Sequence, residues 1–324
     1  MDVLTPRSLD EALALKAEHP HALPIQGGTD VMVELNFDRA RPEALLNLNE
    51  VDELRGWSRD NGTLRLGAGL TYTEAMGLSA DLPALAEASR TVGSPQIRNR
   101  GTLGGNLGTA SPAGDALPPL LVEDARVEVA SVRGSRTLPL ADFVVGVKRN
   151  ALAEDELIVA VLVEPSGAPQ TFMKVGPRNA MVIAVCSLAL AADRERGELR
   201  AAFGSASPTP RLVTAPLAEA AGFPDLVAET ASPIDDVRGT ASYRRHALRV
   251  LTQRALERCR RDLVTLCHLA GGAGFDEDRA LGQRRAARGG RLGRRKPAHD
   301  AARPARPPRF QERLRAGRVR LVLG

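Results

Sequence analysis

Residues 93–115 read GSPQIRNRGTLGGNLGTASPAGD, a stretch unlike the rest of the chain. It gathers glycines, hydroxyl side chains and turn-forming residues, which is not the composition of ordinary protein core. Glycine adopts positive φ without strain and lets a ligand approach the backbone closely. Successive N–H groups in such turns form concave sites that bind anions, especially phosphate. The stretch ends in a rigid turn and the carboxylate of Asp115, which suits a hydroxyl or ring N–H donor on a ligand.

A second, shorter glycine turn lies upstream. Residues 23–31 read LPIQGGTDV, an apolar strand start that runs into two glycines and Thr29. The period of residues 31–35 fits a short helix or strand. Two phosphate-binding turns suit a pyrophosphate held from both sides, which indicates a dinucleotide ligand. Taken alone, each stretch has the alternative interpretation of a surface turn without a ligand.

Neither turn matches the usual nucleotide fingerprints. Outside these turns, Gly67 and Gly69 supply the first two glycines of G-x-G-x-x-G, but Tyr72 fills the position of the third glycine, where close packing requires a small residue. No G-x-x-x-x-G-K-[ST] is present, which disfavours a P-loop ATPase.

Five segments follow one another in the order and spacing of one known family. They are 26–30 (QGGTD), 93–115, 136–143 (RTLPLADF), 155–158 (DELI) and 172–178 (FMKVGPR). With these segments the chain resembles the FAD-binding medium subunits of the molybdenum hydroxylases, the family that contains xanthine dehydrogenase and carbon monoxide dehydrogenase. The resemblance covers residues 1 to about 260 and is closest to the bacterial xanthine dehydrogenase subunits.

The resemblance implies an α+β fold. It places a two-lobed FAD-binding domain of the vanillyl-alcohol-oxidase (PCMH) type at residues 1–165, with lobes at about 1–55 and 56–165. A smaller α+β C-terminal flavoprotein domain is expected at 166–262, after the turn-rich joint at 165–169. The mixture of helical and strand patterns along the chain agrees with this class.

Local patterns predict the individual elements. A first helix is expected to begin at Ser8 or Thr5 and to include residues 11–17, and further helices are expected at 82–91, 215–221 and 243–260. Strands are expected at 22–26, 44–48, 63–69, 126–130, 156–163, 182–192 and 198–206. The stripe of Leu248, Leu251, Ala255 and Leu256 is expected to pack in the core or at a subunit contact.

The cofactor implied is FAD, bound without a covalent link, because neither glycine stretch contains a histidine or cysteine. We expect residues 25–31 and 102–106 to wrap the pyrophosphate through backbone N–H groups, aided by the hydroxyls of Thr29 and Thr102. The expected cofactor-binding residues are Pro24, Ile25, Gln26, Gly27, Gly28, Thr29, Asp30, Val31, Thr102, Leu103, Gly104, Gly105, Asn106, Thr109, Ser111, Asp115, Ile158 and Lys174.

Three of these residues receive distinct roles from the resemblance. Asp115 would contact the ribityl chain or the isoalloxazine ring, and Ile158 would lie against the adenine or the ring. The ammonium of Lys174 near the flavin N1/C2=O edge would stabilise the negative charge of reduced flavin and raise its potential; a solvated surface lysine is the alternative. Asp30, Arg98 and Arg178 are equally consistent with structural ion pairs.

The resemblance implies a flavoprotein oxidoreductase subunit, xanthine dehydrogenase-like, in xanthine or hypoxanthine oxidation. The 2Fe-2S centres and molybdopterin would lie on the partner chains of a heterotrimer, single or dimerised, and electrons would pass through FAD to NAD+ or another acceptor. The three cysteines at 186, 259 and 267 are too few for a four-cysteine cluster, so no metal site is expected. Alternatives are a carbon monoxide dehydrogenase-like or other hydroxylase flavoprotein, a stand-alone flavin reductase, and a basic binding protein acting through its tail.

The C-terminal segment changes in character. Residues 263–324 contain 15 Lys and Arg against 5 Asp and Glu, although the whole chain has a net charge of only +5. We expect this tail to be disordered or to result from a shifted reading frame. Nucleic acid is not expected as a partner, since aromatic residues are not interleaved with the basic ones. The N-terminus has no signal-peptide pattern and no run is long enough for a membrane span, which predicts a cytoplasmic protein.

Overall fold

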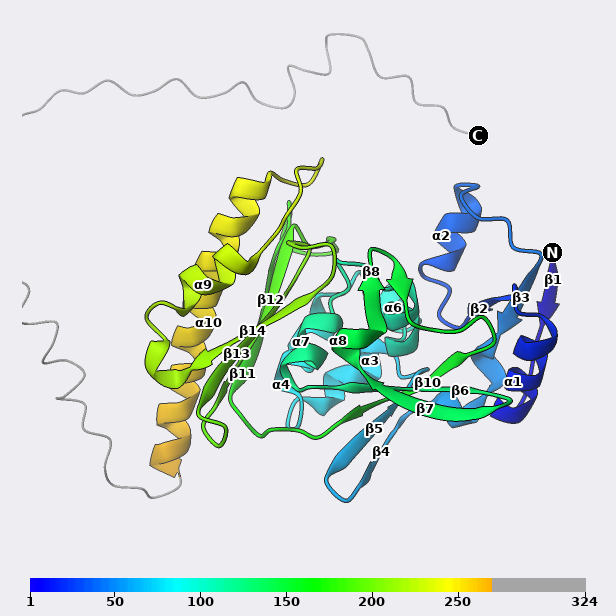
Figure 1. Cartoon of the computed structure of the whole chain (residues 1–324), viewed down its shortest axis with the longest axis horizontal. Helices are drawn as coiled ribbons and strands as arrows, with labels where there is room; N and C mark the ends of the chain where they lie inside the picture. The colour runs from blue at the N-terminus through cyan, green and yellow to red at the C-terminus, as the bar shows by residue number, and fades with distance from the viewer. Residues whose placement is uncertain (270–324) are drawn as a thin grey trace, which may run out of the picture. The chain divides into compact units, whose positions relative to one another are not determined.

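The structure, a computed structural model, describes the backbone of residues 1–269 and the side chains of residues 1–262 (Figure 1). These residues form a mixed helix and strand fold in which sheets alternate with helices. The last helix, α10 (Ala241–Leu269), continues past residue 262, where the basic tail was expected to begin. The remainder of that predicted tail, 270–324, lies outside the described residues.

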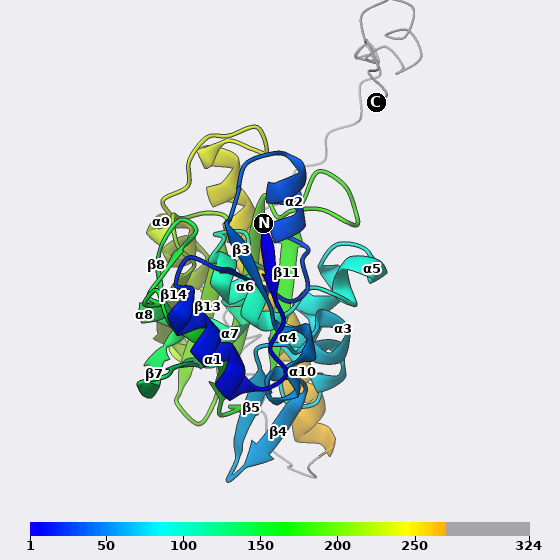
Figure 2. The same ribbon diagram turned by 90° about the vertical axis from the view of Figure 1, so that its right-hand side faces the viewer.

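A small parallel sheet carries the first glycine turn. Its strands are β1 (Asp2–Leu4), β3 (Ala44–Asn47) and β2 (Leu23–Ile25), in that spatial order. Helix α1 (Leu9–Glu18) connects β1 to β2, and the Ser8 hydroxyl accepts a hydrogen bond from the Glu11 N–H at 3.2 Å, which confirms Ser8 as its N-cap. Helix α2 (Val31–Asn36) is the next element after β2, so the glycine turn at 26–30 lies between a strand and a helix. Figure 2 shows α1 and this sheet at the front.

An antiparallel sheet forms the centre of the first 165 residues. Its order is β4 (Trp57–Asp60), β5 (Thr63–Gly67), β10 (Leu157–Val163), β6 (Arg126–Ser131) and β7 (Gly134–Pro139). The middle strand β10 reads LIVAVLV and is almost wholly buried, since it has neighbours on both edges and packing on both faces. The β4–β5 hairpin extends away from the rest of the sheet in both views (Figures 1 and 2). A short hairpin of β8 (Val144–Gly146) and β9 (Arg149–Asn150) follows α8 (Leu140–Phe143).

The stretch 93–115 contains two helices in place of the single long loop that its composition suggests. They are α5 (Pro95–Arg98) and α6 (Leu103–Thr109), preceded by α3 (Tyr72–Ala75) and α4 (Pro83–Thr91) and followed by α7 (Leu117–Val122). The hydroxyls of Ser94 and Thr102 cap α5 and α6 by accepting from the N–H groups of Ile97 and Gly105. Hydroxyl residues therefore start helices here, although the glycines lower helix propensity.

A second antiparallel sheet, here called the C-terminal sheet, contains β11 (Gln170–Val175), β12 (Cys186–Asp193), β13 (Glu198–Gly204) and β14 (Arg211–Pro216). Helices α4 and α7 contact one side, while α9 (Phe223–Thr230) and α10 cover the other (Figure 1). Leu248, Leu251 and Ala255 of α10 are buried in the core beneath the sheet, which confirms that the predicted stripe is core.

Two predicted elements differ from the structure. The strand expected at 182–192 begins only at Cys186, because residues 182–184 leave the sheet. The helix expected at 215–221 is wrong: β14 pairs with β13 as far as Pro216, and a single 3-10 turn (Leu217–Glu219) follows. The other predicted strands, and the helix at 82–91, agree with the structure to within about two residues at either end.

Candidate functional site

The two glycine stretches meet at one cavity. Its volume is about 630 Å³, a size typical of small-molecule sites. All the expected cofactor-binding residues line it except Leu103 and Lys174. Leu103 is fully buried in the core, since its side chain lies on the inner side of α6.

The first stretch crosses the second at Gly27. A Cβ atom there would lie only 2.0 Å from the carbonyl oxygen of Arg100, so only glycine fits. The Arg100 guanidinium donates at 3.2 Å both to the Gln26 carbonyl oxygen and to the Asn49 side-chain oxygen. This crossing fixes the position of the 26–30 turn.

The backbone of the 26–30 turn offers free donors. In the part of the chain that the structure describes, no acceptor is hydrogen-bonded to the N–H groups of Gly27, Gly28 and Thr29. Gly28 has φ +73°, a value that turns successive N–H groups toward one side. The turn can therefore bind an anion as the sequence predicts.

The 102–106 segment is different. The N–H groups of Leu103 and Gly104 donate to Leu70 O at 2.9 Å and Ala68 O at 2.7 Å. Those of Gly105 and Asn106 donate to the side-chain and backbone oxygens of Thr102, each at 3.0 Å. Within the described residues, the N–H groups from Leu103 to Asn106 therefore already have acceptors in the protein, whereas no acceptor is bonded to the Thr102 N–H. The segment forms a close-packed wall of the cavity, and its contact with a pyrophosphate stays a prediction.

A hydrogen bond holds this wall beside the turn, and a close backbone approach packs it against Ala68. Thr109 donates its hydroxyl to the Asp30 carboxylate at 2.9 Å, and a Cβ at Gly104 would lie 2.7 Å from Ala68 O. Asp30 thus joins the two stretches through a hydrogen bond. Arg98 donates to the carbonyls of Val92 and Gly93, and Arg178 donates to carbonyls within its own loop.

Buried acceptors also line the cavity. In the part of the chain whose side chains are described, Asn106 Oδ1 and Asp115 Oδ1 are buried without a hydrogen-bond donor, and both residues line the cavity. A Cβ at Gly114 would lie 2.9 Å from the Asn106 side chain, so this glycine makes room for the amide. Because a buried acceptor without a donor is costly, a ligand with hydroxyl or N–H groups suits this wall. FAD carries both kinds of group, since its phosphates accept hydrogen bonds and its ribityl hydroxyls and ring N–H donate them.

Lys174 lies behind Asp115. Its ammonium is 2.6 Å from Asp115 Oδ2 and also donates to Thr91 O at 2.9 Å and Val182 O at 3.2 Å. Both side chains are almost wholly buried. Burial raises the pKa of Asp115 above its usual value, and the Lys174 ammonium offsets part of that increase.

Several lining residues are missing from the sequence-based set. Tyr72 appeared there only as a mismatch to a glycine fingerprint, yet it is buried beside the cavity, and burial raises its pKa well above the usual value. Asn150 donates to Gly108 O at 2.8 Å and so holds the end of α6. Glu156, inside the recognised DELI segment, accepts from Arg136 at 2.7 Å, and this contact lowers the pKa of Glu156. Residues 181–183, between β11 and β12, carry no distinctive signal.

Among the side chains that the structure describes, those of residues 1–262, no group of three or more His, Cys, Asp or Glu is positioned to hold a metal ion. None of the helices described over this range combines the length and apolar character needed to cross a membrane.

Comparisons with known proteins agree on one family. The profile of the FAD-binding domain in molybdopterin dehydrogenase matches residues 1–165. The xanthine dehydrogenase FAD-binding subunit of Escherichia coli O157:H7 is 31% identical, over 77% of this chain and 92% of that protein. The nicotine 6-hydroxylase medium subunit of Paenarthrobacter nicotinovorans is 30% identical, over 78% of this chain and 94% of that protein. In the carbon monoxide dehydrogenase structure from Hydrogenophaga pseudoflava, one chain superposes with a TM-score of 0.74 at 26% identity, covering 80% of this chain and 96% of that one.

Proposed function

The chain belongs to the family of FAD-binding subunits of molybdopterin dehydrogenases, and we propose that it relays electrons from 2Fe-2S centres on a partner chain, through non-covalent FAD, to NAD+ or another acceptor. The observation that carries this proposal is the cavity, whose described residues supply both backbone donors without an acceptor and buried acceptors without a donor. The fold proposed for residues 1–165 is the vanillyl-alcohol-oxidase type.

Different residues of the cavity would bind different parts of FAD. The N–H groups of Gly27, Gly28 and Thr29 would bind the pyrophosphate, because they are free donors in a turn before a helix. Asn106 and Asp115 would accept hydrogen bonds from the ribityl chain or the ring, and Ile158 would provide an apolar contact. When bound, FAD supplies a two-electron acceptor that exchanges electrons with one-electron centres.

Lys174 is proposed to tune the cofactor. Its buried ammonium orients Asp115 and places positive charge close to the cavity. Positive charge in a poorly screened position stabilises added negative charge, which raises a reduction potential. Lys174→Met should lower the midpoint potential of bound flavin, whereas Lys148→Met, which removes an exposed lysine paired with Glu34 at 3.0 Å, should leave it unchanged. An equal potential in both variants would remove Lys174 from this role.

Partners would supply the rest of the enzyme. We propose that separate subunits carry the 2Fe-2S centres and molybdopterin in a heterotrimer, and that xanthine or hypoxanthine is oxidised there. The relatives named above act on different compounds according to their names, so the partner subunit would select the substrate. The structural likeness to carbon monoxide dehydrogenase supports a second candidate, a complex of that type. Copurified complex assayed with hypoxanthine and with carbon monoxide distinguishes the two.

FAD binding itself is the first test. The purified chain, reconstituted with FAD and freed of excess cofactor, should show a flavin absorption spectrum with about one flavin per chain. A well-folded protein that retains no flavin would refute the proposal. If FAD is bound but electrons from the partner complex do not reduce it, the proposed relay is refuted and the proposed cofactor site is not.

A further inference from the structure

Helix α7 connects the cavity to the C-terminal sheet. It begins just after Asp115, and all its residues, Leu117–Val122, are buried. With a rise of about 1.5 Å per residue, Asp115 lies roughly 10 Å from Val122 along the helix. A tightly packed helix moves as a unit, so a shift at its C-terminal end also moves the Asp115 carboxylate.

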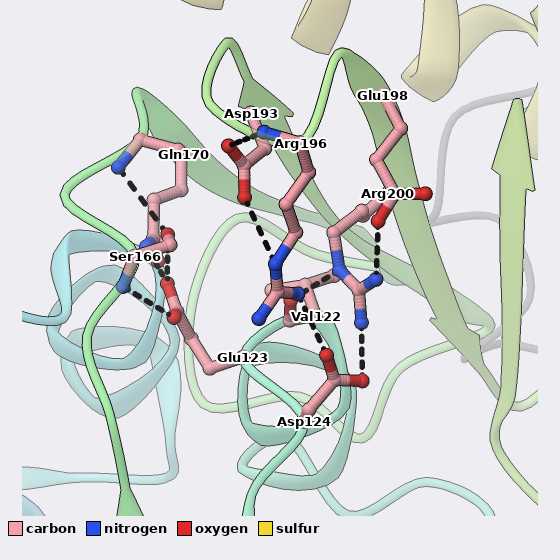
Figure 3. Close-up of polar contacts among 10 residues, drawn as sticks. Val122, Glu123, Asp124, Ser166, Gln170, Asp193, Arg196, Glu198 and Arg200 are labelled. Atoms are coloured by element: carbon pink, nitrogen blue, oxygen red, sulfur yellow. Dashed lines mark hydrogen bonds and ion pairs between the residues drawn. The ribbon is translucent and has the colours of Figure 1, made fainter. Parts of the chain in front are cut away.

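Arg200 of β13 caps the C-terminal end of α7 (Figure 3). Its Nε donates to Val122 O at 2.8 Å, one of the carbonyls left without a partner inside the helix. Its other nitrogens donate to Glu198 at 2.6 Å and to Asp124. Only 7% of the Arg200 side chain is exposed, so its bond to Val122 O is shielded from water, although the Asp124 side chain is 52% exposed. A cation at a helix C-terminus also interacts favourably with the helix dipole.

Glu123 ties the same end of α7 to the chain that enters the C-terminal sheet (Figure 3). Its carboxylate accepts from the Ser166 N–H at 2.9 Å, the Ser166 hydroxyl at 3.0 Å and the Gln170 side-chain amide. Gln170 begins β11, and Lys174 of the same strand is bonded to Asp115. Helix α7 and strand β11 are therefore joined at both ends of the helix.

We propose that Arg200 is a positioning residue for the cofactor site, fixing α7 from outside the cavity and thereby setting the position of Asp115. Arg200 does not line the cavity, so its influence passes through the helix. This inference rests on the proposed binding of FAD. It extends the site beyond the residues that contact the ligand and into the C-terminal sheet.

Arg196 provides a matched control for Arg200. It donates to the same Asp124 at 2.7 Å, but its side chain is 46% exposed, and it bonds to the carboxylates of Asp124 and Asp193 without the bond to Val122 O that Arg200 makes. Arg200→Met should raise the Kd of FAD about 5- to 20-fold and shift the midpoint potential of bound flavin. Arg196→Met should change the Kd by no more than about twofold. Arg200→Lys, which retains the charge beside Asp124 and Glu198, should recover part of the loss.

A double-mutant cycle tests the route through Asp115. In an Asp115→Asn background, adding Arg200→Met should change the Kd by less than about twofold, because the two residues then act on one contact. Far-UV circular dichroism and thermal unfolding establish that each variant folds. If Arg200→Met does not fold, the comparison is made with Arg200→Lys in both backgrounds.

Three results would overturn the inference. They are an unchanged Kd and potential in folded Arg200 variants, an equal effect of Arg196→Met, and full additivity with Asp115→Asn. A wild-type protein that binds no FAD would defeat the proposed function and this inference together. A wild-type protein that binds FAD while Arg200 variants match it would defeat the positioning role alone.

Discussion

The two glycine stretches at the cavity are similar in composition but use their backbones differently. Over the residues that the structure describes, the N–H groups of Gly27, Gly28 and Thr29 in the 26–30 turn have no acceptor, whereas in the 102–106 segment every N–H from Leu103 to Asn106 is bonded within the protein. The first is a donor site and the second is a packed wall. Glycine permits both, because it allows close backbone approach as readily as it allows a concave turn.

The close approaches also differ in what they meet. Gly27 approaches the Arg100 carbonyl, part of the backbone that joins the two stretches, whereas Gly104 approaches Ala68 at the foot of the central sheet. Substitution at Gly27 should therefore disturb ligand binding most, and substitution at Gly104 should mainly disturb packing. Three predictions test this division, and a fourth concerns a carboxylate that lines the same cavity.

The largest effect is expected for Gly27→Ala. A Cβ 2.0 Å from Arg100 O forces the 26–30 turn to move, and overpacking of this kind costs about 1–3 kcal/mol of unfolding free energy. Because the free donors move with the turn, the Kd of FAD should rise about 100-fold, as expected when two or three charge-assisted hydrogen bonds are misplaced. Isothermal titration of the apoprotein measures the affinity. Gly77→Ala is the control, since nothing lies within 4 Å of its added Cβ, and an equal loss there would contradict the prediction.

Gly104→Ala should have a smaller effect on binding. Its Cβ would lie 2.7 Å from Ala68 O, which should lower the free energy of unfolding by about 1–3 kcal/mol, measured by urea denaturation. The Kd of FAD should rise less than in Gly27→Ala, because no free donor is displaced. If Gly104→Ala raised the Kd of FAD more than Gly27→Ala and left the free energy of unfolding unchanged, the 102–106 segment would be the donor site and the 26–30 turn the packed wall.

Thr102→Val tests the same difference between the two glycine stretches, and its expected effect is smaller. It removes the N-cap of α6, which accepts from Gly105 N at 3.0 Å, and caps are worth about 1 kcal/mol. Thermal unfolding should detect that loss while the FAD affinity changes by no more than about twofold. Loss of affinity without loss of stability would make the hydroxyl a direct ligand contact.

The smallest effect on stability is expected for a change at Glu156, which also lines the cavity. The Arg136 contact lowers the pKa of Glu156 below 4.5, so its contribution to stability is present at neutral pH and is lost as pH falls through the folded-state value. Glu156→Gln should cost at most about 1 kcal/mol at pH 7, because Arg136 is half exposed. Urea denaturation at a series of pH values should show the wild type and variant converging in acid. A constant difference at every pH would show that ionisation of Glu156 does not contribute.

Much of the fold follows from local signals. Ser8 capped its helix as predicted, and the alternating or apolar runs at 126–130 and 156–163 became strands. Of the helices inside 93–115, α6 was not predicted because its glycines lower helix propensity, and α5 was not predicted because it is only four residues long; the capping hydroxyls are their local signal. The helix expected at 215–221 failed because pairing with β13 outweighed a weak local preference.

The site was predictable where ligand-facing residues are consecutive. The cavity contains 24–31 and most of 102–115 because each stretch lies along one side of it. Tyr72 and residues 181–183 come from distant parts of the chain and carry ordinary residue types, so only the tertiary fold identifies them. Whether a backbone N–H group is available to a ligand or already bonded depends on neighbouring carbonyls such as Ala68 O. No local sequence pattern reveals these carbonyls.

The cavity wall formed by residues 181–183 has an evolutionary consequence. The matched FAD-binding domain ends at residue 165, but this wall and the Lys174 partner of Asp115 come later in the chain. Recombination that joined residues 1–165 to an unrelated C-terminal domain would separate a buried carboxylate from its cation and open one side of the cavity. The structural unit that encloses the cavity is therefore longer than the matched domain and includes the C-terminal sheet.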